Sequence, residues 1–266
     1  MPYGTVSSKT RILISIPASK NIEFDQEESE PEYQNLQVEF DRIRELGVGG
    51  LDHVVSDILN LIVLPHSLTA SQLNKVQLQP SRGMIFSGPP GTGKTLLAHT
   101  LSDILNAHFQ VVRGPELMTG VVGGAAEAVR RLFDAAEADW KEYGCSSPLH
   151  VIVIDEIDSL CPPRGYSNGL DGGASNQVVG QFLAMLDGMT KINNIILVGT
   201  TNRYDMIDSA LKRPGRLEHH FAIGLPDQDG REAIWRIHTE AMVQEKIIDE
   251  DWIPELAKRS EGFSGA

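Results

Sequence analysis

Cysteine, excess positive charge and long apolar runs are all scarce in this sequence. Only two cysteines, Cys145 and Cys161, occur in 266 residues, too few for a disulfide framework or a cysteine-rich metal cluster. The formal net charge is −13, which argues against nonspecific binding to nucleic acid or anionic lipid as the main activity. No apolar run approaches the roughly 18 residues that span a bilayer. The first residues also lack a signal-peptide pattern, so we predict a cytosolic protein.

The first 40 residues differ in composition from the rest. Residues 11–16 form a short apolar run that could be a strand, and residues 23–32 are acidic and poor in apolar side chains. One strand alone is not stable, and the acidic stretch has the composition of a linker. We interpret residues 1–40 as the tail of an upstream domain plus a linker, or as a disordered arm. The helical segments predicted after residue 227 are too few to close a compact lid, so we also expect the sequence to be a fragment of a longer protein.

Residues 41–227 have the pattern of an α/β core. Continuous apolar runs predict strands, and helical periodicity predicts the segments between them: strands at 84–87, 109–112, 150–154 and 195–198; helices at 96–105, 127–142 and 176–186. Continuous apolar strands separated by helices indicate a parallel sheet covered by helices on both faces. The stretch 162–175 is a Gly-rich loop. Helices at 231–243 and 251–259 predict the start of a small helical lid within residues 228–266. We interpret the three tryptophans of the sequence, Trp140, Trp235 and Trp252, as residues that pack helices.

A phosphate loop is the most specific motif. Residues 88–95, GPPGTGKT, fit G-x-x-x-x-G-K-[ST] between a predicted strand and a predicted helix, which is the context that the motif requires. Glycines let backbone N–H groups surround phosphates, and the next helix presents its N-terminus to the same anion. Lys94 supplies positive charge and the Thr95 hydroxyl can ligate Mg²⁺. The predicted phosphate-binding residues are Gly88, Pro89, Pro90, Gly91, Thr92, Gly93, Lys94, Thr95 and Leu96.

Two carboxylates follow the apolar strand at 150–154. Asp155, at the end of a central parallel strand, is placed to hold Mg²⁺ through water. Glu156 is the candidate general base that orients and deprotonates an attacking water. The phosphate loop by itself predicts binding of ATP or GTP, and the two carboxylates add Mg²⁺ as a cofactor and hydrolysis as the reaction. The family resemblance given below selects ATP.

Three further polar residues are weaker candidates. Asn202 follows the strand at 195–198 and could hydrogen-bond the γ-phosphate, although Asn is common in such loops. Arg213 and Arg216 flank Pro-Gly on a short loop. This loop could be a solvated basic turn, or in a ring it could reach a neighbour's γ-phosphate. Spacing does not choose between these alternatives.

Together these motifs resemble the AAA ATPases, hexameric rings that remodel proteins. The resemblance covers residues 46–266 and rests on the phosphate loop, Asp155-Glu156, Asn202 and the sequence RPGR at 213–216. Shorter stretches are similar to the first ATPase domain of one branch, the vesicular-fusion ATPases of the N-ethylmaleimide-sensitive-factor type. They are GVGGLD at 47–52, RGPEL at 113–117, DEID at 155–158, NNI at 193–195, TNR at 201–203, IGLPD at 223–227 and IHT at 237–239.

The resemblance implies roles for several residues. Val48 and Gly49 would lie against the adenine, His238 would contact the nucleoside, and Gly265 and Ala266 would open the lid segment that touches the base. Asn202 would sense the γ-phosphate, and Arg213 and Arg216 would be arginine fingers acting across a subunit interface. It further implies a homohexamer that disassembles SNARE complexes through an adaptor, with no nucleic acid, in the cytoplasm and peripheral to secretory-pathway membranes.

The sequence departs from the family pattern at two positions. Val121 stands where the first pore loop carries an aromatic residue, and Val cannot stack or wedge as Tyr can, so substrate grip is in doubt. Thr92 stands where several relatives have Cys, which predicts resistance to thiol reagents. Two alternative functions remain: another AAA unfoldase or segregase, or a nucleotide-dependent assembly module with weak motor activity.

Overall fold

The computed structural model describes residues 43, 46–67, 80–118, 124–161, 172–188 and 192–266. These residues all belong to one unit, Tyr33–Ala266. The strand predicted at 11–16, the acidic linker, Val121 and most of the Gly-rich loop predicted at 162–175 lie outside the described residues.

Five parallel strands form one sheet in the order β2-β3-β4-β1-β5. The strands are β1 (Gly83–Ser87), β2 (His108–Arg113), β3 (His150–Asp155), β4 (Ile195–Thr201) and β5 (His219–Ala222). The chain leaves β1 for the far edge, returns through β3 and β4, and then places β5 on the other side of β1. In such sheets a ligand binds beyond the carboxyl ends of the strands, where the order reverses.

Two hydrophobic cores cover the sheet because successive strand residues point to opposite faces. On β3, Ile152 and Ile154 join one core, and Val151 and Val153 join the other. All four are essentially inaccessible to solvent. The predicted parallel sheet with helices on both faces is confirmed.

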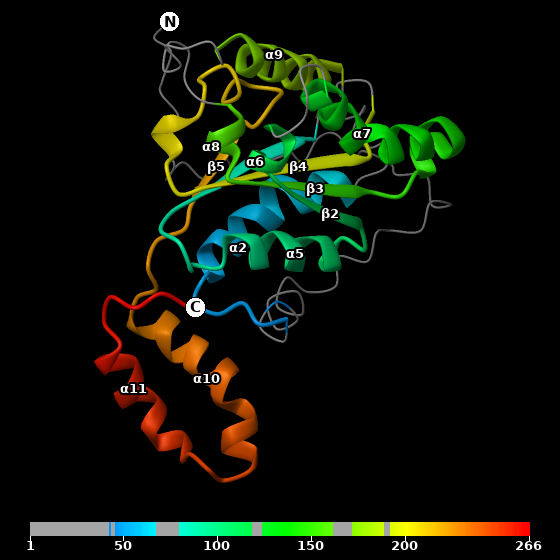
Figure 1. The fold of residues 1–266 in the computed structure, drawn as a ribbon. Helices are drawn as coiled ribbons and strands as arrows, with labels where there is room; N and C mark the ends of the chain where they lie inside the picture. The colour runs from blue at the N-terminus through cyan, green and yellow to red at the C-terminus, as the bar shows by residue number, and fades with distance from the viewer. Residues whose placement is uncertain (1–42, 44–45, 68–79, 119–123, 162–171, 189–191) are drawn as a thin grey trace, which may run out of the picture. The chain divides into compact units, whose positions relative to one another are not determined.

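Helices α2 (Asp52–Ile58) and α5 (Lys94–Ile104) lie on one face, and α7 (Gly124–Tyr143) and α9 (Gly172–Gly188) lie on the other (Figure 1). The apolar side of α7 that the sequence predicted is buried, with Val129 and Phe133 fully inaccessible. The shorter elements are a π-helical turn η1 (Leu59–Val63), α3 (Leu64–Ser67), α6 (Gly114–Met118), η2 (Gly144–Ser146), α8 (Ile157–Leu160) and η4 (Tyr204–Met206). Among the described residues, no helix combines the length and apolarity needed to cross a membrane.

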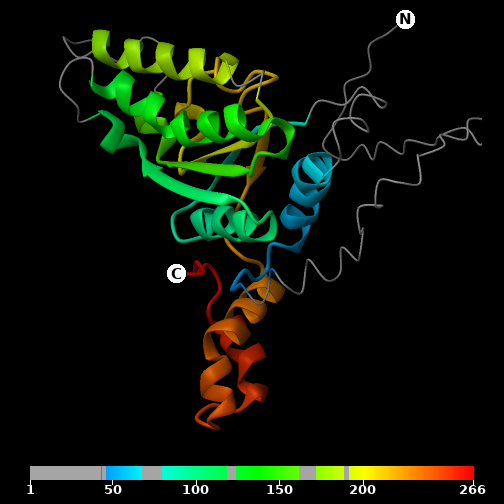
Figure 2. The same ribbon diagram turned by 90° about the vertical axis from the view of Figure 1, so that its right-hand side faces the viewer.

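Two further helices, α10 (Gln228–Gln244) and α11 (Ile253–Arg259), pack side by side after the sheet (Figures 1 and 2). The Asp227 side chain caps α10 by accepting a hydrogen bond from the Gly230 N–H at 2.8 Å, the usual role of Asp at this position. The buried Arg231 guanidinium joins the helices by donating to the Ala257 carbonyl at 2.7 Å. A 3₁₀ turn, η5 (Glu250–Trp252), precedes α11.

Four sequence-based expectations need correction. Strand β4 continues to Thr201 instead of ending at 198, because Thr is a good strand former and pairs with Ser87. Strand β5 was not among the strands assigned from apolar runs, since its sequence HHFA has none; the sequence indicated only a partly exposed strand end at His219 and His220. Helix α9 begins at Gly172, inside the predicted loop. Trp252 is 64% exposed, because it lies in the turn before α11 instead of packing between helices.

Candidate active site

The phosphate loop connects β1 to α5 at the carboxyl edge of the sheet. Its first glycine, Gly88, has a φ of 147°, and a Cβ there would lie 1.8 Å from the Ile223 carbonyl oxygen. Only glycine therefore allows the loop to leave β1 beside β5. Gly93, at a φ of 87°, precedes α5, so the loop runs directly into the N-terminus of a helix. The local geometry is that of an anion site.

The Lys94 ammonium is bound by the loop itself. Nζ donates to the carbonyls of Gly88 at 3.0 Å and Pro89 at 2.7 Å, and the side chain is buried. Burial lowers the pKa of Lys94, while the negative charge of Asp155 opposes that shift. An anion in the loop would offer Nζ a charged acceptor, which forms a stronger hydrogen bond than a carbonyl.

Asp155 and Glu156 follow the last apolar residue of β3. Asp155 is half-buried and accepts a hydrogen bond from the Thr200 hydroxyl on neighbouring β4. Glu156 has a left-handed backbone, with a φ of 54°, and an exposed side chain. Its carbonyl accepts hydrogen bonds from the Ser159 N–H at 3.0 Å and hydroxyl at 2.7 Å. These bonds hold a backbone conformation that costs a non-glycine residue about 1–3 kcal/mol.

A polar network supports Asn202 at the end of β4. The Thr201 hydroxyl donates to Asp158 at 2.7 Å and accepts from the Arg203 N–H at 2.9 Å. Arg203 also donates to Asp158, at 3.0 Å. Asn202 itself is exposed and lies between two residues that this network fixes.

A cavity of about 460 Å³ joins these groups, within the roughly 300–1,000 Å³ of ligand pockets. It is lined by predicted site residues Val48, Gly49, Pro90, Gly91, Thr92, Gly93, Lys94, Thr95, Leu96, Asp155, Glu156, Asn202, His238, Gly265 and Ala266. It is also lined by Gly47, Leu51, Thr201 and Ile234, which sequence analysis did not assign. Gly88 and Pro89 do not line the cavity; their carbonyls instead hold Lys94.

The cavity has one wall from the segment at 47–51 and another from the α10–α11 region. Gly50, at a φ of 73°, approaches α10 so closely that a Cβ would lie 2.4 Å from the Gly230 Cα. After α11, the Gly265 N–H donates to the Gly91 carbonyl of the phosphate loop at 3.0 Å. The long sequence separation of these walls explains why Ile234 was missed.

Neither Arg213 nor Arg216 lines the cavity. Arg216 is 17% exposed and donates to both carboxylate oxygens of Asp187 at 2.8 Å and to the Ala210 carbonyl at 2.6 Å. The hydrogen bond from Arg216 lowers the pKa of Asp187, and the same bond raises the pKa of Arg216. Arg213, three residues earlier, is exposed. The two arginines thus have different environments.

The fold and cavity define a phosphate-loop nucleotide-binding domain, and comparison with known proteins identifies its family. Residues 84–225, more than half of the chain, match the ATPase family associated with various cellular activities (AAA). The chain belongs to this family and is an ATPase domain that binds nucleotide.

Similar proteins share a more particular name. The chain is 43% identical over 227 residues to vesicular-fusion protein sec18 of Schizosaccharomyces pombe, covering 85% of this chain and 28% of the relative. It is 43% identical over 223 residues to the vesicle-fusing ATPase of Dictyostelium discoideum, covering 83% and 30%. It is 41% identical over 227 residues to vesicular-fusion protein SEC18 of Saccharomyces cerevisiae, covering 85% and 30%. The chain thus spans about three-tenths of the length of these relatives.

Proposed function

We propose that this domain hydrolyses ATP with Mg²⁺ and that Glu156 is the general base. The observation that carries the proposal is the single cavity containing Lys94, Asp155, Glu156 and Asn202. Thr95 and Asp155 offer the oxygen donors that Mg²⁺ prefers and line the same cavity, so they fit the ion. Mg²⁺ would supply charge neutralisation at the phosphates.

The protein's own residues bind the nucleotide and activate the water. Lys94 leaves the loop carbonyls to bind phosphate oxygens. Glu156 accepts a proton from the attacking water, and Asn202 orients that water or the γ-phosphate. The nucleoside is contacted by residues from two sides of the cavity: Val48, Gly49, His238, Gly265 and Ala266.

Glu156→Gln tests the catalytic assignment because it keeps size and hydrogen bonding but removes the base. We expect turnover to fall by about 10²–10⁴-fold with ATP affinity retained. Lys94→Ala is the matched variant, and should lose ATP binding. Unchanged turnover in Glu156→Gln would overturn the base assignment.

We further propose that the whole protein is a homohexameric vesicle-fusing ATPase that disassembles adaptor-bound SNARE complexes at secretory-pathway membranes. The vesicle-fusing part of this proposal is supported by the names of the similar proteins. The hexamer, the adaptor and the SNARE complexes follow from the family resemblance of the sequence motifs, and an exposed Arg213 suits a finger reaching a neighbouring subunit. The test measures ATP turnover and SNARE release by the full-length protein, with and without adaptor-loaded complexes. Stimulated turnover that Glu156→Gln abolishes is expected. Turnover without SNARE release would favour another AAA remodelling activity, and ATP-dependent assembly without turnover would favour an assembly module.

A further inference from the structure

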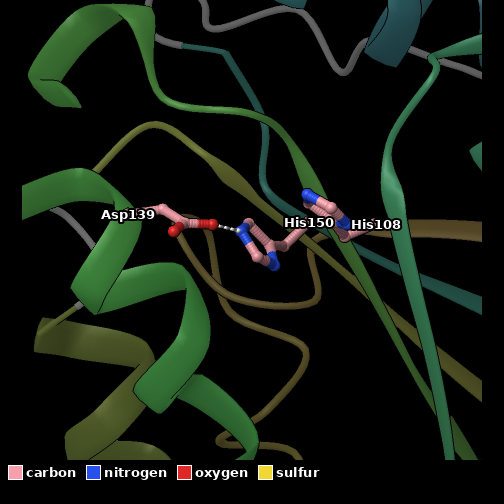
Figure 3. Close-up of side chains that lie close together, drawn as sticks. All are labelled: His108, Asp139 and His150. Atoms are coloured by element: carbon pink, nitrogen blue, oxygen red, sulfur yellow. Dashed lines mark hydrogen bonds and ion pairs between the residues drawn. The ribbon is translucent and has the colours of Figure 1, made fainter. Parts of the chain in front are cut away.

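A second group of side chains that can bind a metal lies at the amino ends of the strands, away from the nucleotide cavity at their carboxyl ends. His108 is the first residue of β2 and His150 is the first residue of β3, and the two residues are directly paired in register. Asp139 comes from α7. One ligand atom from each side chain lies within 4.8 Å of the others, and Figure 3 shows the three side chains gathered together.

The contacts within this group are already close. His150 Nε2 and an Asp139 carboxylate oxygen are 2.8 Å apart, and the rings of His108 and His150 have centroids 4.9 Å apart. Zn²⁺ bonds of about 2.0–2.2 Å in tetrahedral geometry place neighbouring ligand atoms roughly 3.3 Å apart. Small side-chain rotations therefore suffice to bring all three ligands onto one ion.

The backbone around the three residues is fixed by hydrogen bonds. Asn194 joins two of the elements: its carbonyl accepts from the His150 N–H at 2.8 Å, and its side-chain amide donates to the Ala136 carbonyl of α7 at 2.8 Å. Ala136 lies about one helical turn from Asp139. The His108 N–H donates to the Leu149 carbonyl at 2.8 Å, next to His150. Such support is what holds metal ligands in place.

The group is open to solvent on the side of His108. His150 is buried, Asp139 is half-buried and His108 is exposed. An ion therefore has a path from solvent, and water can complete its coordination shell. Two imidazoles and one carboxylate favour a first-row transition ion over Mg²⁺ or Ca²⁺, which prefer oxygen donors.

We propose that His108, Asp139 and His150 form a binding site for a divalent transition-metal ion, for which Zn²⁺ is the best match. The site is separate from the nucleotide cavity, because β3 carries about 17 Å of chain between His150 and Asp155 at roughly 3.3 Å per residue. The ion would tie α7 to the amino ends of β2 and β3, and its role would be structural.

The test uses the 266-residue chain, stripped with chelator and free of nucleotide because ATP itself binds metals. Co²⁺ is titrated in excess Mg²⁺ while visible absorption is followed, and Zn²⁺ is then added as competitor. We expect one Co²⁺ per chain, displaced by Zn²⁺. His108→Gln, Asp139→Asn and His150→Gln should each weaken binding by at least the roughly 10–100-fold seen when a supporting partner is lost.

His99→Gln is the matched control. His99 also pairs with a carboxylate, Asp103, at 3.1 Å, but among the described residues no third histidine, cysteine or carboxylate joins this pair. This variant should bind Co²⁺ as the unmodified chain does. His108 is exposed, so its variant tests the site even where replacing buried His150 disturbs folding. Absence of saturable one-to-one binding, or affinity unchanged in His108→Gln, would overturn the proposal.

Thermal unfolding gives an independent readout. An ion that binds only the folded chain raises the melting temperature with concentration. We expect Zn²⁺ to stabilise the unmodified chain and His99→Gln but to leave His108→Gln unchanged. Equal stabilisation of all three proteins would place the ion elsewhere and contradict the assignment.

Discussion

The guanidinium of Arg216 binds the carboxylate of Asp187 through two hydrogen bonds of 2.8 Å each, one to each carboxylate oxygen. Arg213, on the same loop, is exposed. Within the part of the chain that the structure describes, its guanidinium makes no hydrogen bond of this kind. The family resemblance implied the same role, an arginine finger, for both arginines. In the structure, Arg216 is bound within the chain to Asp187, whereas Arg213 is exposed.

The first prediction concerns Arg213→Ala. We expect an unfolding free energy within about 0.5 kcal/mol of the unmodified chain, since exposed substitutions cost little. Turnover of the assembled full-length protein should fall by about 10³–10⁵-fold if the side chain acts as an arginine finger. Urea unfolding and steady-state ATPase assays measure the two effects.

Arg216→Ala provides the contrast. It removes donors to Asp187 and to the Ala210 carbonyl, so the domain should lose about 1 kcal/mol of stability. Equal destabilisation by both variants would contradict the distinction drawn between the two arginines.

The second prediction concerns the backbone of Glu156. Glycine adopts a left-handed backbone without strain, so the replacement removes a destabilisation of about 1–3 kcal/mol. It also increases the entropy of the unfolded chain, which destabilises the folded state by about 0.5–1 kcal/mol. Glu156→Gly should therefore be about 1 kcal/mol more stable than Glu156→Gln in urea unfolding, with both variants inactive. A less stable glycine variant would show that the φ of 54° carries no strain.

The third prediction concerns thiol chemistry. Cys161 is fully buried, and burial, with a contribution from Asp208, raises the pKa of its thiol, so little reactive thiolate forms at neutral pH. In a Cys145→Ser background we expect N-ethylmaleimide to leave ATP hydrolysis intact. Thr92→Cys, which places a thiol in the phosphate loop, should make hydrolysis sensitive. Mass spectrometry of the native protein would show whether Cys161 is modified.

The fourth prediction concerns pH. Burial lowers the pKa of His66, His219 and His220 in the folded chain. The unfolded chain therefore binds protons more readily, and stability is lost as pH falls below the ordinary histidine pKa of about 6.5. His66 is the most buried of the three and should contribute most of this pH dependence, with a slope of at most about 1.4 kcal/mol per pH unit in that window; the more exposed His219 and His220 should contribute less because solvent screens them.

Chemical unfolding between mildly alkaline and mildly acidic pH measures this slope. His66 Nε2 lies 2.9 Å from the Ser81 carbonyl oxygen, so His66→Gln can keep a donor there while removing the titration. A reduced slope in that variant is expected. An unchanged slope would remove His66 from the explanation.

Local sequence determined much of the fold and the centre of the cavity. The run from β1 through GPPGTGKT into α5, and the apolar strand before Asp155, place their functional groups within a few residues of chain. Their geometry follows from strand–turn–helix rules, and the same cavity is lined by Lys94, Asp155 and Asn202.

Contacts between distant segments were beyond sequence reasoning. Arg216 and Asp187 lie 29 positions apart, and His108, Asp139 and His150 meet only because β2, β3 and α7 pack together. Strand β5 carries no apolar run, since it lies at the sheet edge. Pairing with β1, rather than its own composition, makes it a strand.

The hydrogen bond from Gly265 to Gly91 has a mechanical consequence. The two ends of the nucleotide cavity, the loop that would receive phosphates and the chain that follows α11, are joined through one peptide group. Because both glycines also line the nucleotide cavity, a shift of the phosphate loop relative to the chain after α11 must stretch or break this bond. The bond therefore makes the position of one wall of the cavity depend on the position of the other.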